Sequence, residues 1–120
     1  MTGDARPNLR RIEGFSMSDK QVAHMVFFTL TDGSEEAVQK LINACDNYLT
    51  GHDGTVYYSA GTRGPEFARE VNNQTYDVGL HVVFESKAAH DQYQTHERHL
   101  AFIAENKDNW ASVDIFDTYV

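Results

Sequence analysis

The sequence predicts an α+β, ferredoxin-like domain, in which a β-α-β-β-α-β order builds a four-stranded antiparallel sheet with helices on one face. Two apolar segments, residues 22–30 and 76–84, have faces that alternate at period two and predict two strands. Residues 35–49 place apolar residues at helical spacing, and residues 87–107 favour a second helix that is split in two. A chain of 120 residues has room for one such domain with one modest core.

The first strand covers Val22–Leu30, and both of its faces are largely apolar, so we expect both faces to be covered. Asp32 and Gly33 turn the chain, and Ser34 can cap a helix that begins with two glutamates. The apolar stripe of that helix consists of Val38, Leu41, Ile42, Cys45 and Leu49. Cys45 lies inside the stripe, which indicates a small core residue rather than a reactive thiol.

The remaining elements follow from turn and capping residues. We expect a turn at 51–54, a strand at 55–61, a polar loop at 62–74, a third strand at 75–84, short helices at 87–93 and 97–107, and a fourth strand at 110–120. Ser86 is the expected N-cap of the first short helix. The predicted buried face of the third strand is formed by Tyr76, Val78, Leu80, Val82 and Phe84, and one face of the fourth by Val113, Ile115 and Tyr119.

The formal net charge of −8, from 18 acidic and 10 basic residues, argues against two classes of partner. A nucleic-acid binder needs clustered basic side chains, and so does attachment to an anionic membrane surface. The single cysteine excludes an internal disulfide and a cysteine zinc site. No apolar run reaches the roughly 18 residues that a membrane span needs. We therefore expect a cytoplasmic protein.

Residues 1–20 are predicted to form an N-terminal tail, and residues 21–120 the folded domain. The tail has no sustained apolar periodicity. Met17 is a candidate translation start, and a flexible extension explains the same segment equally well. In either case we expect residues 1–17 to be dispensable for stability, because they offer no apolar pattern to bury.

One face of the expected sheet has no helix to cover it. The side chains on that face are Ala23, Met25 and Phe27 in the first strand, and Gly79, His81 and Val83 in the third. So apolar a face needs a partner, and for a single domain the simplest partner is a second copy of the chain. We therefore predict a homodimer through the sheet face, which would bury mainly Met25, Phe27, His81 and Val83.

Titratable side chains gather just after the third strand and define the candidate site. Tyr93, His96 and His99 are spaced three apart, so neighbouring pairs share a helix face. His24 lies on the helix-facing side of the first strand. An imidazole can exchange a proton near neutral pH, and a phenol can donate to an oxyanion. The expected apolar walls of a small-molecule cavity are Val26, Phe28, Leu41, Val78, Leu80, Val82, Phe102 and Trp110.

A series of short motifs resembles a known family. In chain order they are His24-Met-Val-Phe-Phe-Thr-Leu, Gly61, Tyr76-Asp77, Phe84-Glu-Ser and Tyr93-x-x-His96-x-x-His99. Together they are similar to the dimeric α/β-barrel family known as the stress-responsive A/B barrel (Dabb) domain, over residues 22–120. The family's usual Tyr-x-x-His-Pro-x-His has Glu97 here in place of proline, which changes how the helix begins and leaves both histidines in position.

The resemblance implies a homodimer whose two sheets form a barrel, with a cavity in each subunit between sheet and helices. Most members have no assigned reaction. Plant polyketide cyclases of the family perform a cofactor-free aldol condensation with a tyrosine and a histidine that match Tyr93 and His99, beside a histidine that matches His24. The resemblance thus implies a stress-responsive protein that binds a small apolar or carbonyl compound. The alternatives are a cofactor-independent lyase or cyclase with Tyr93 and His99 as catalytic residues, and a cofactor-free monooxygenase.

Structural explanations stay open for the same histidines. His24 can bond a helix carbonyl in the core, and His96 and His99 can cap or satisfy the chain between two helices. A metal set of His90, His96 and His99 has workable spacing, but no carboxylate or cysteine completes a known signature. We therefore expect no metal and no cofactor. The two histidines with an expected structural role are His52 and His81.

Overall fold

The computed structural model describes residues 20–120, which form one four-stranded antiparallel sheet and three α-helices. The elements are β1 (Val22–Leu30), α1 (Glu35–Tyr48), β2 (Thr55–Thr62), β3 (Val78–Phe84), α2 (Lys87–Thr95), α3 (Glu97–Asn106), the 3₁₀ turn η2 (Lys107–Asn109) and β4 (Trp110–Tyr119). The strand order β2-β3-β1-β4 confirms the predicted ferredoxin-like α+β fold, with its second helix split in two. The predictions for residues 1–17 and for Met17 as a start lie outside the described residues.

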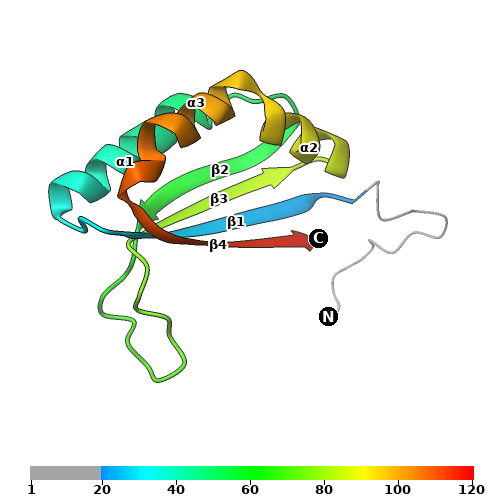
Figure 1. Cartoon of the computed structure of the whole chain (residues 1–120). Coiled ribbons are helices and arrows are strands. Elements are labelled where there is room, and N and C mark those ends of the chain that lie inside the picture. Colours follow the sequence, from blue (N-terminus) through cyan, green and yellow to red (C-terminus); the bar gives the residue numbers. More distant parts are fainter. Residues whose placement is uncertain (1–19) are drawn as a thin grey trace.

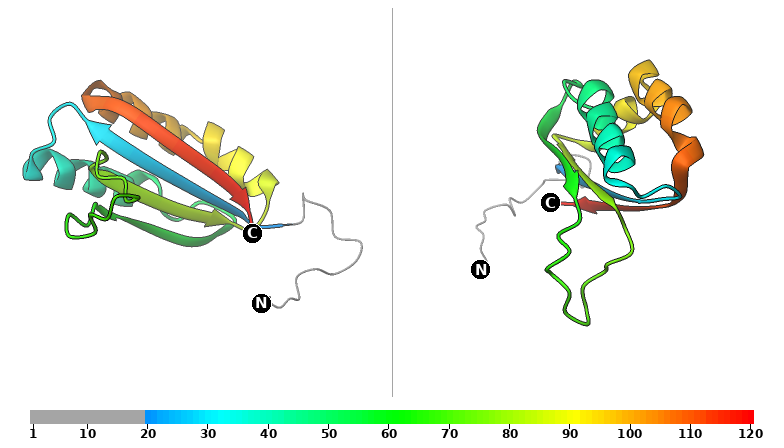
Figure 2. Two further views of the ribbon diagram at one scale, coloured as in Figure 1. Left: turned by 90° about the horizontal axis from the view of Figure 1, so that it is seen from below. Right: turned by 90° about the vertical axis from the view of Figure 1, so that its left-hand side faces the viewer.

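All three of these helices lie on one face of the sheet (Figure 1). From the opposite side the described residues leave the strands in view (Figure 2), and we call this side the uncovered face. The long connection between β2 and β3, residues 63–77, projects away from the helices on that side. Within residues 20–120 no helix is both long and apolar enough to cross a membrane.

The central strand β1 sets the position of the core. Its even-numbered residues are buried towards the helices, and its odd-numbered residues are partly exposed on the uncovered face. The register places His24 opposite Val82 in β3 and opposite Asp117 in β4, and residues paired in this way project from the same face. Burial raises the pKa of the Cys45 thiol to about 12, in keeping with a core role. The core consists of Val26, Phe28, Leu30, Leu41, Cys45, Leu49, Val78, Leu80, Val82, Phe84, Ala89, Tyr93 and Phe102.

The third strand begins at Val78 and not at residue 75. The prediction that Tyr76 shares the buried face was wrong, because the chain joins the sheet only after Tyr76. Its ring contacts Phe27 edge-on, with 5.0 Å between ring centroids. Gly79 leaves room for this contact, since a β-carbon there would lie 3.4 Å from the Phe27 ring. Tyr76 therefore extends the uncovered face rather than the core.

Asp77 holds the start of β3 against the end of β1. Its backbone N–H donates to the Phe28 carbonyl at 2.7 Å, and its carboxylate accepts from the Leu30 N–H at 2.8 Å. Arg63, at the start of the projecting loop, brings its guanidinium within 4.0 Å of the same carboxylate. One side chain thus connects the loop to both central strands.

The residue before each helix fixes where that helix starts. The Ser34 hydroxyl accepts from the Ala37 N–H at 3.2 Å, as predicted, and Ser86 caps α2 in the same way. His96 plays this part for α3, because its Nδ1 accepts from the Arg98 N–H at 3.1 Å. The extended backbone of His96, with ψ of 141°, ends α2 and begins α3. This residue therefore explains the split in the second helix.

The turn between α1 and β2 packs directly against α2. Gly54 in this turn has a φ of 83°, in the left-handed region that favours glycine. A β-carbon at this position would lie 2.5 Å from the β-carbon of Ala89, which is too close for any side chain. Helix α2 therefore packs directly on the backbone of this turn.

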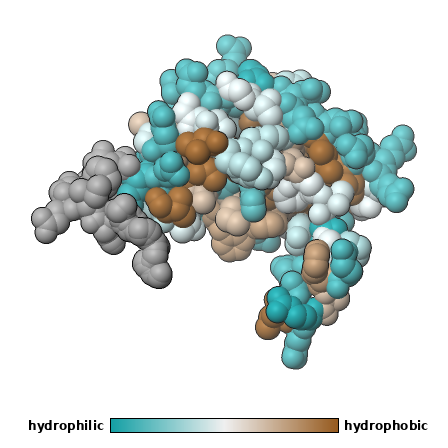
Figure 3. Space-filling model, turned by 180° about the vertical axis from the view of Figure 1, so that it is seen from behind, coloured by the Kyte–Doolittle hydropathy of each residue, from teal (hydrophilic) through white to brown (hydrophobic). Residues whose placement is uncertain are grey.

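The uncovered face of the sheet is rich in aromatic rings. Tyr57 is 53% exposed and Phe116 is 58% exposed in the single chain, and the Phe116 ring lies 6.1 Å from that of Phe27. The projecting loop carries hydrophobic atoms as well (Figure 3), and its Phe67 and Val71 are largely exposed. Sheet and loop thus present apolar groups on the same side of the molecule.

We expect Asp77→Ala to lower the free energy of unfolding by about 1–3 kcal/mol, because the Leu30 N–H at the end of β1 loses its acceptor. Asp77→Asn keeps an oxygen at this place and should lose less. Urea titrations of the three proteins measure the difference. An equal loss in both variants would show that the negative charge beside Arg63 matters and not the hydrogen bond.

Candidate functional site

Rings from five different elements meet around Tyr93, and we call this group the ring cluster. Its members are His24 of β1, His52 of the turn after α1, Phe84 of β3, Tyr93 of α2 and His99 of α3. The Tyr93 ring centroid lies 5.8 Å from that of His24, 5.0 Å from His52, 4.8 Å from Phe84 and 4.6 Å from His99. The fold thus brings together three side chains singled out from the sequence, Tyr93, His99 and His24, and adds His52.

The hydroxyl of Tyr93 lies buried in the protein interior. It is sealed from solvent, and among residues 20–120 nothing lies within hydrogen-bond reach of it. Burial, and to a lesser extent the nearby Cys45 thiol, raise the pKa of this phenol well above its usual range. Tyr93 therefore stays protonated at neutral pH and offers a hydrogen-bond donor inside the protein.

His99 is half-buried, and its hydrogen bond fixes which of its nitrogens is basic. Its Nδ1–H donates to the Gln94 carbonyl at 3.1 Å, which leaves Nε2 as the acceptor of the neutral ring. Burial lowers the pKa of His99, the Gln94 bond opposes this, and the neighbouring His24 and His52 lower the pKa further. The ring is therefore neutral near pH 7, with Nε2 as an atom that can take a proton.

His24 is only 3% exposed, and its partner is a carboxylate rather than a helix carbonyl. The Nδ1–H donates to Oδ1 of Asp117 at 2.5 Å, from the residue directly opposite in β4. Burial lowers the pKa of His24, and the bond to Asp117 opposes that shift. His24 is thus a neutral ring held in one orientation by the neighbouring strand.

The rings of His52 and His96 meet edge-on, with 4.8 Å between their centroids. The His52 Nε2–H donates to the Tyr48 carbonyl at 2.8 Å, which fits the structural role predicted for it. His96 is exposed, and its Nδ1 caps α3. A crevice of about 100 Å³ opens here, lined by Gly51, His52, Asp53, Gln92, Tyr93, His96 and Arg98.

Most of the predicted apolar walls are packed core. The buried ones are Val26, Phe28, Leu41, Val78, Leu80, Val82 and Phe102. Val78 and Val82 have no accessible surface, so these two side chains face no space that water can enter. Ile115, which pairs with Val26 on the same face, is 55% exposed. The helices therefore leave the outer strand β4 partly open beside the ring cluster.

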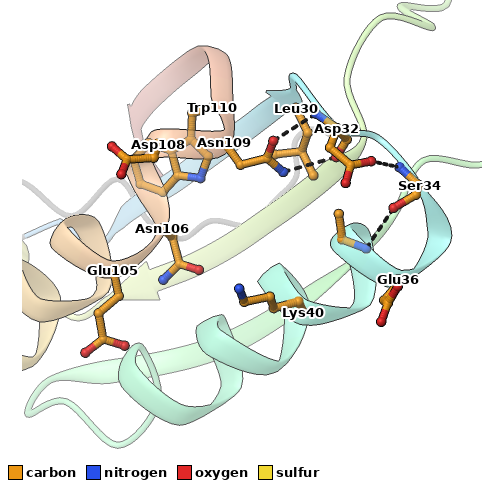
Figure 4. A pocket seen from close by; sticks show the side chains of 11 residues that line it. Leu30, Asp32, Ser34, Glu36, Lys40, Glu105, Asn106, Asp108, Asn109 and Trp110 are labelled. Carbon is orange, nitrogen blue, oxygen red and sulfur yellow. Dashed lines mark hydrogen bonds between the residues drawn. The ribbon is translucent and has the colours of Figure 1, made fainter.

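A larger hollow of about 400 Å³ lies between the start of α1 and the residues that join α3 to β4 (Figure 4). Asp32 and Asn109 close one side of it through two hydrogen bonds of 2.8 and 3.0 Å. Trp110, predicted as a wall of the site, lines this hollow, and its indole N–H has no partner among the described residues. Glu36 and Lys40 make its rim charged. No ring-cluster member lines it, so it is a separate feature.

Two further side chains, His90 and Asp117, lie beside His24 and are not among the predicted site residues. The His90 ring centroid is 5.2 Å from that of His24, and its Nε2 is 3.7 Å from Oδ1 of Asp117. Of the three histidines considered above as a metal set, only His90 joins a group of metal-ligating side chains within residues 20–120. Asp117 could have been found from the sequence by pairing the first predicted strand with the last, since this pairing places Asp117 opposite His24.

Comparisons with known proteins support the fold assignment. The family model described as Stress responsive A/B Barrel Domain (Dabb) matches residues 22–120. A Dabb family protein with a ferredoxin-like fold from Mesorhizobium loti is similar in structure, with a TM-score of 0.70 at 18% identity; the match covers 84% of this chain and 97% of that one. The comparison with curated proteins gave no match.

Two other solved structures are similar to the same degree. A dimeric ferredoxin-like protein of unknown function from Thermobifida fusca has a TM-score of 0.70 at 16% identity, covering 92% of this chain and 100% of that chain. The hydroxynitrile lyase from Passiflora edulis has a TM-score of 0.70 at 16% identity, covering 85% and 94%. At such identities the likeness shows a common fold, and the assembly and activity remain properties of those proteins.

The buried histidines predict a loss of stability in acid. Burial lowers the pKa of His24, His52 and His99 in the folded protein, so the unfolded chain binds their protons more readily. Their contribution is complete above the unfolded pKa of about 6.5 and is lost as the pH falls below it. We expect the melting temperature to drop between about pH 7 and pH 5, and His99→Gln to weaken this dependence.

The matched control is Leu100→Ala, because Leu100 is exposed on α3 and its substitution changes no titratable group. Thermal melts across the pH series should give the control the same profile as the unsubstituted protein. A melting temperature that is flat over this range would contradict the burial of neutral imidazoles.

Proposed function

The chain belongs to the stress-responsive A/B barrel (Dabb) family, and on that basis we propose that it is a homodimer that binds a small carbonyl compound at the ring cluster. The observation that supports binding most strongly is the Tyr93 hydroxyl, which is buried and has no partner among the described residues. An unpaired buried hydroxyl costs about 1–3 kcal/mol, and native proteins keep few of them. A ligand oxygen that accepts from Tyr93 would remove this cost.

His99 supplies a second polar contact for such a ligand. Its ring lies 4.6 Å from the Tyr93 ring, and its Nε2 is an acceptor while the phenol is a donor. A compound with a carbonyl oxygen beside an O–H or an acidic C–H matches a donor and an acceptor this close together. An apolar site with a few convergent polar groups is the usual form of a small-molecule site.

The room at the cluster limits the size of the compound. The crevice of about 100 Å³ lies on the His52 side of Tyr93, without His99 in its lining, and is smaller than the roughly 300–1,000 Å³ of sites for drug-sized ligands. It suits a ligand of a few non-hydrogen atoms.

A cofactor-independent lyase is the second candidate, and the protonation states favour it. The His99 Nε2 would take a hydroxyl proton from the substrate while Tyr93 donates to the same oxygen. The adjacent C–C bond would break to give a carbonyl, and the leaving carbanion or cyanide would take the proton from His99. The Passiflora edulis enzyme supports this reading by analogy of fold alone.

The Tyr93→Phe variant tests whether the Tyr93 hydroxyl serves ligand binding or the stability of the fold. We expect the free energy of unfolding to stay the same or to rise, because the hydroxyl has no hydrogen bond to lose. The affinity for small aldehydes and ketones should fall about tenfold, the equivalent of one hydrogen bond of about 1.4 kcal/mol. Calorimetric titration with a panel of such compounds and urea unfolding give the two quantities.

The lyase candidate adds a kinetic test with cyanohydrins and β-hydroxy ketones as substrates. Turnover should disappear in both Tyr93→Phe and His99→Ala, while Leu100→Ala on the exposed side of α3 keeps it. Equal carbonyl affinity in Tyr93→Phe and the unsubstituted protein would contradict the proposed site. Binding without turnover would retain the binding protein and reject the enzyme.

We propose that the homodimer forms through the uncovered face of the sheet. Tyr57 and Phe116 are each more than half exposed there, and the loop over residues 63–77, which carries the exposed Phe67 and Val71, projects on the same side. Exposed aromatic rings gathered on one face of a sheet are typical of an interaction site. The relative from Thermobifida fusca, described as dimeric, is consistent with this arrangement.

We expect Val83→Asp to convert the dimer to monomer or aggregate, because a charge would be buried between the two sheets. Light scattering at micromolar concentration measures the mass. Leu100→Asp is the matched control, since Leu100 is 53% exposed on α3 and should leave the dimer intact. A folded monomer of the unsubstituted protein would refute the assembly.

A further inference from the structure

We propose that His24, His90 and Asp117 form a binding site for one divalent transition-metal ion between β1, α2 and β4. Within residues 20–120 this is the one group in which three metal-ligating atoms, one from each side chain, lie within 4.8 Å of one another. The site shares His24 with the ring cluster, but it does not depend on the function proposed for that cluster.

The distances are close to those around a metal ion. His24 Nδ1 and Asp117 Oδ1 are 2.5 Å apart, and His90 Nε2 is 3.7 Å from the same carboxylate oxygen. Ligand atoms at bond lengths of about 2.0–2.2 Å in a tetrahedral site lie about 3.3–3.6 Å from one another. The two observed distances lie on either side of this range. The remaining pair of ligand atoms, from His24 and His90, lies within 4.8 Å. Small side-chain movements would admit the ion, provided that the proton on Nδ1 of His24 moves to solvent or to Nε2 of the same ring, because the metal binds the unprotonated nitrogen.

The scaffold already holds the three side chains near these positions. His24 and Asp117 face each other across the antiparallel β1–β4 ladder, and both point towards the helices. His24 is almost fully buried, so its ring has little freedom to lose on binding. His90 projects from α2 so that its ring meets the His24 ring at 5.2 Å. Ligands on strands and helices give a better defined site than ligands on loops.

The hydrogen bonds of His90 leave one of its ring nitrogens able to bind a metal ion. Its Nδ1–H donates to Oδ1 of Asp91 at 3.1 Å, which leaves Nε2 unprotonated. A carboxylate behind the ligating histidine is the usual outer-shell arrangement in metal sites. The Nε2 accepts only a long bond of 3.3 Å from the Gln94 amide, and a metal ion would replace it. This second observation is independent of the ligand spacing.

The set of ligands selects the class of metal. Two imidazoles and one carboxylate suit Zn²⁺ and related ions such as Co²⁺, whereas Mg²⁺ and Ca²⁺ prefer sites made of oxygen atoms alone. The Asp117 side chain is 43% exposed, so an ion can enter from solvent and keep a coordination position open to water. A simple histidine–aspartate pair would explain the contact of His24 with Asp117, but not the position of His90.

The experiment is a titration of the full-length, tag-free protein with Zn²⁺ by calorimetry and with Co²⁺ by visible absorption. We expect one ion per chain, and no binding of Mg²⁺ at the same concentration. His90→Ala and Asp117→Asn should each lower the Zn²⁺ affinity by about 100-fold or more, beyond the roughly 10–100-fold that loss of an outer-shell partner causes. Zn²⁺ should raise the melting temperature of the unsubstituted protein and not that of the variants.

The variants are chosen so that folding does not confuse the result. His90 and Asp117 are more exposed than His24, and asparagine can still accept the hydrogen bond of His24. Glu97→Gln, which removes an exposed carboxylate from α3, should bind Zn²⁺ like the unsubstituted protein. Tyr93→Phe should also keep its metal, which separates this site from the carbonyl site. The proposal is overturned if the unsubstituted protein binds no stoichiometric Zn²⁺ or Co²⁺, or if binding survives both His90→Ala and Asp117→Asn.

Discussion

Antiparallel pairing on both sides of β1 is the constraint on which the rest of the structure depends. Side chains alternate along a strand, so the register that places Val26 beneath the helices also places His24 there. The neighbouring strands then add Val82 and Asp117 to the same row. A slip of one residue would exchange this face with the uncovered one and send Phe27 into the core. The core, the ring cluster and the aromatic uncovered face all follow from one register.

The sequence predicts the fold well because the fold rests on local periodicity. Period-two alternation locates β1 at its observed bounds, and serine caps locate the starts of α1 and α2. The same periodicity fails at Tyr76, where alternation continues in the sequence although the chain has not yet joined the sheet. Periodicity describes which faces a strand would have, and hydrogen bonding decides where the strand begins.

The site could be predicted only in part, for a related reason. Tyr93 and His99 lie close in sequence, and strand parity adds His24. The helical spacing that linked them through His96 does not hold, because the chain is extended at His96 and the two rings come from separate helices. Asp117 is 93 residues from His24, and only the order of strands in the sheet brings the two together. His52 reaches Tyr93 from a turn that has no repeating pattern. Contacts of this kind depend on tertiary packing and leave no local mark in the chain.

Gly54 shows how a residue outside the site can govern it. Its backbone touches Ala89, and Ala89 belongs to the helix that also presents His90 and Tyr93. A methyl group at position 54 would clash with Ala89 and displace that helix, and both rings would move with it. A substitution at this turn would therefore disturb the ring cluster while every ring stays unaltered in the sequence. Selection that maintains the ring cluster would therefore preserve the glycine of this turn as strictly as it preserves the histidines.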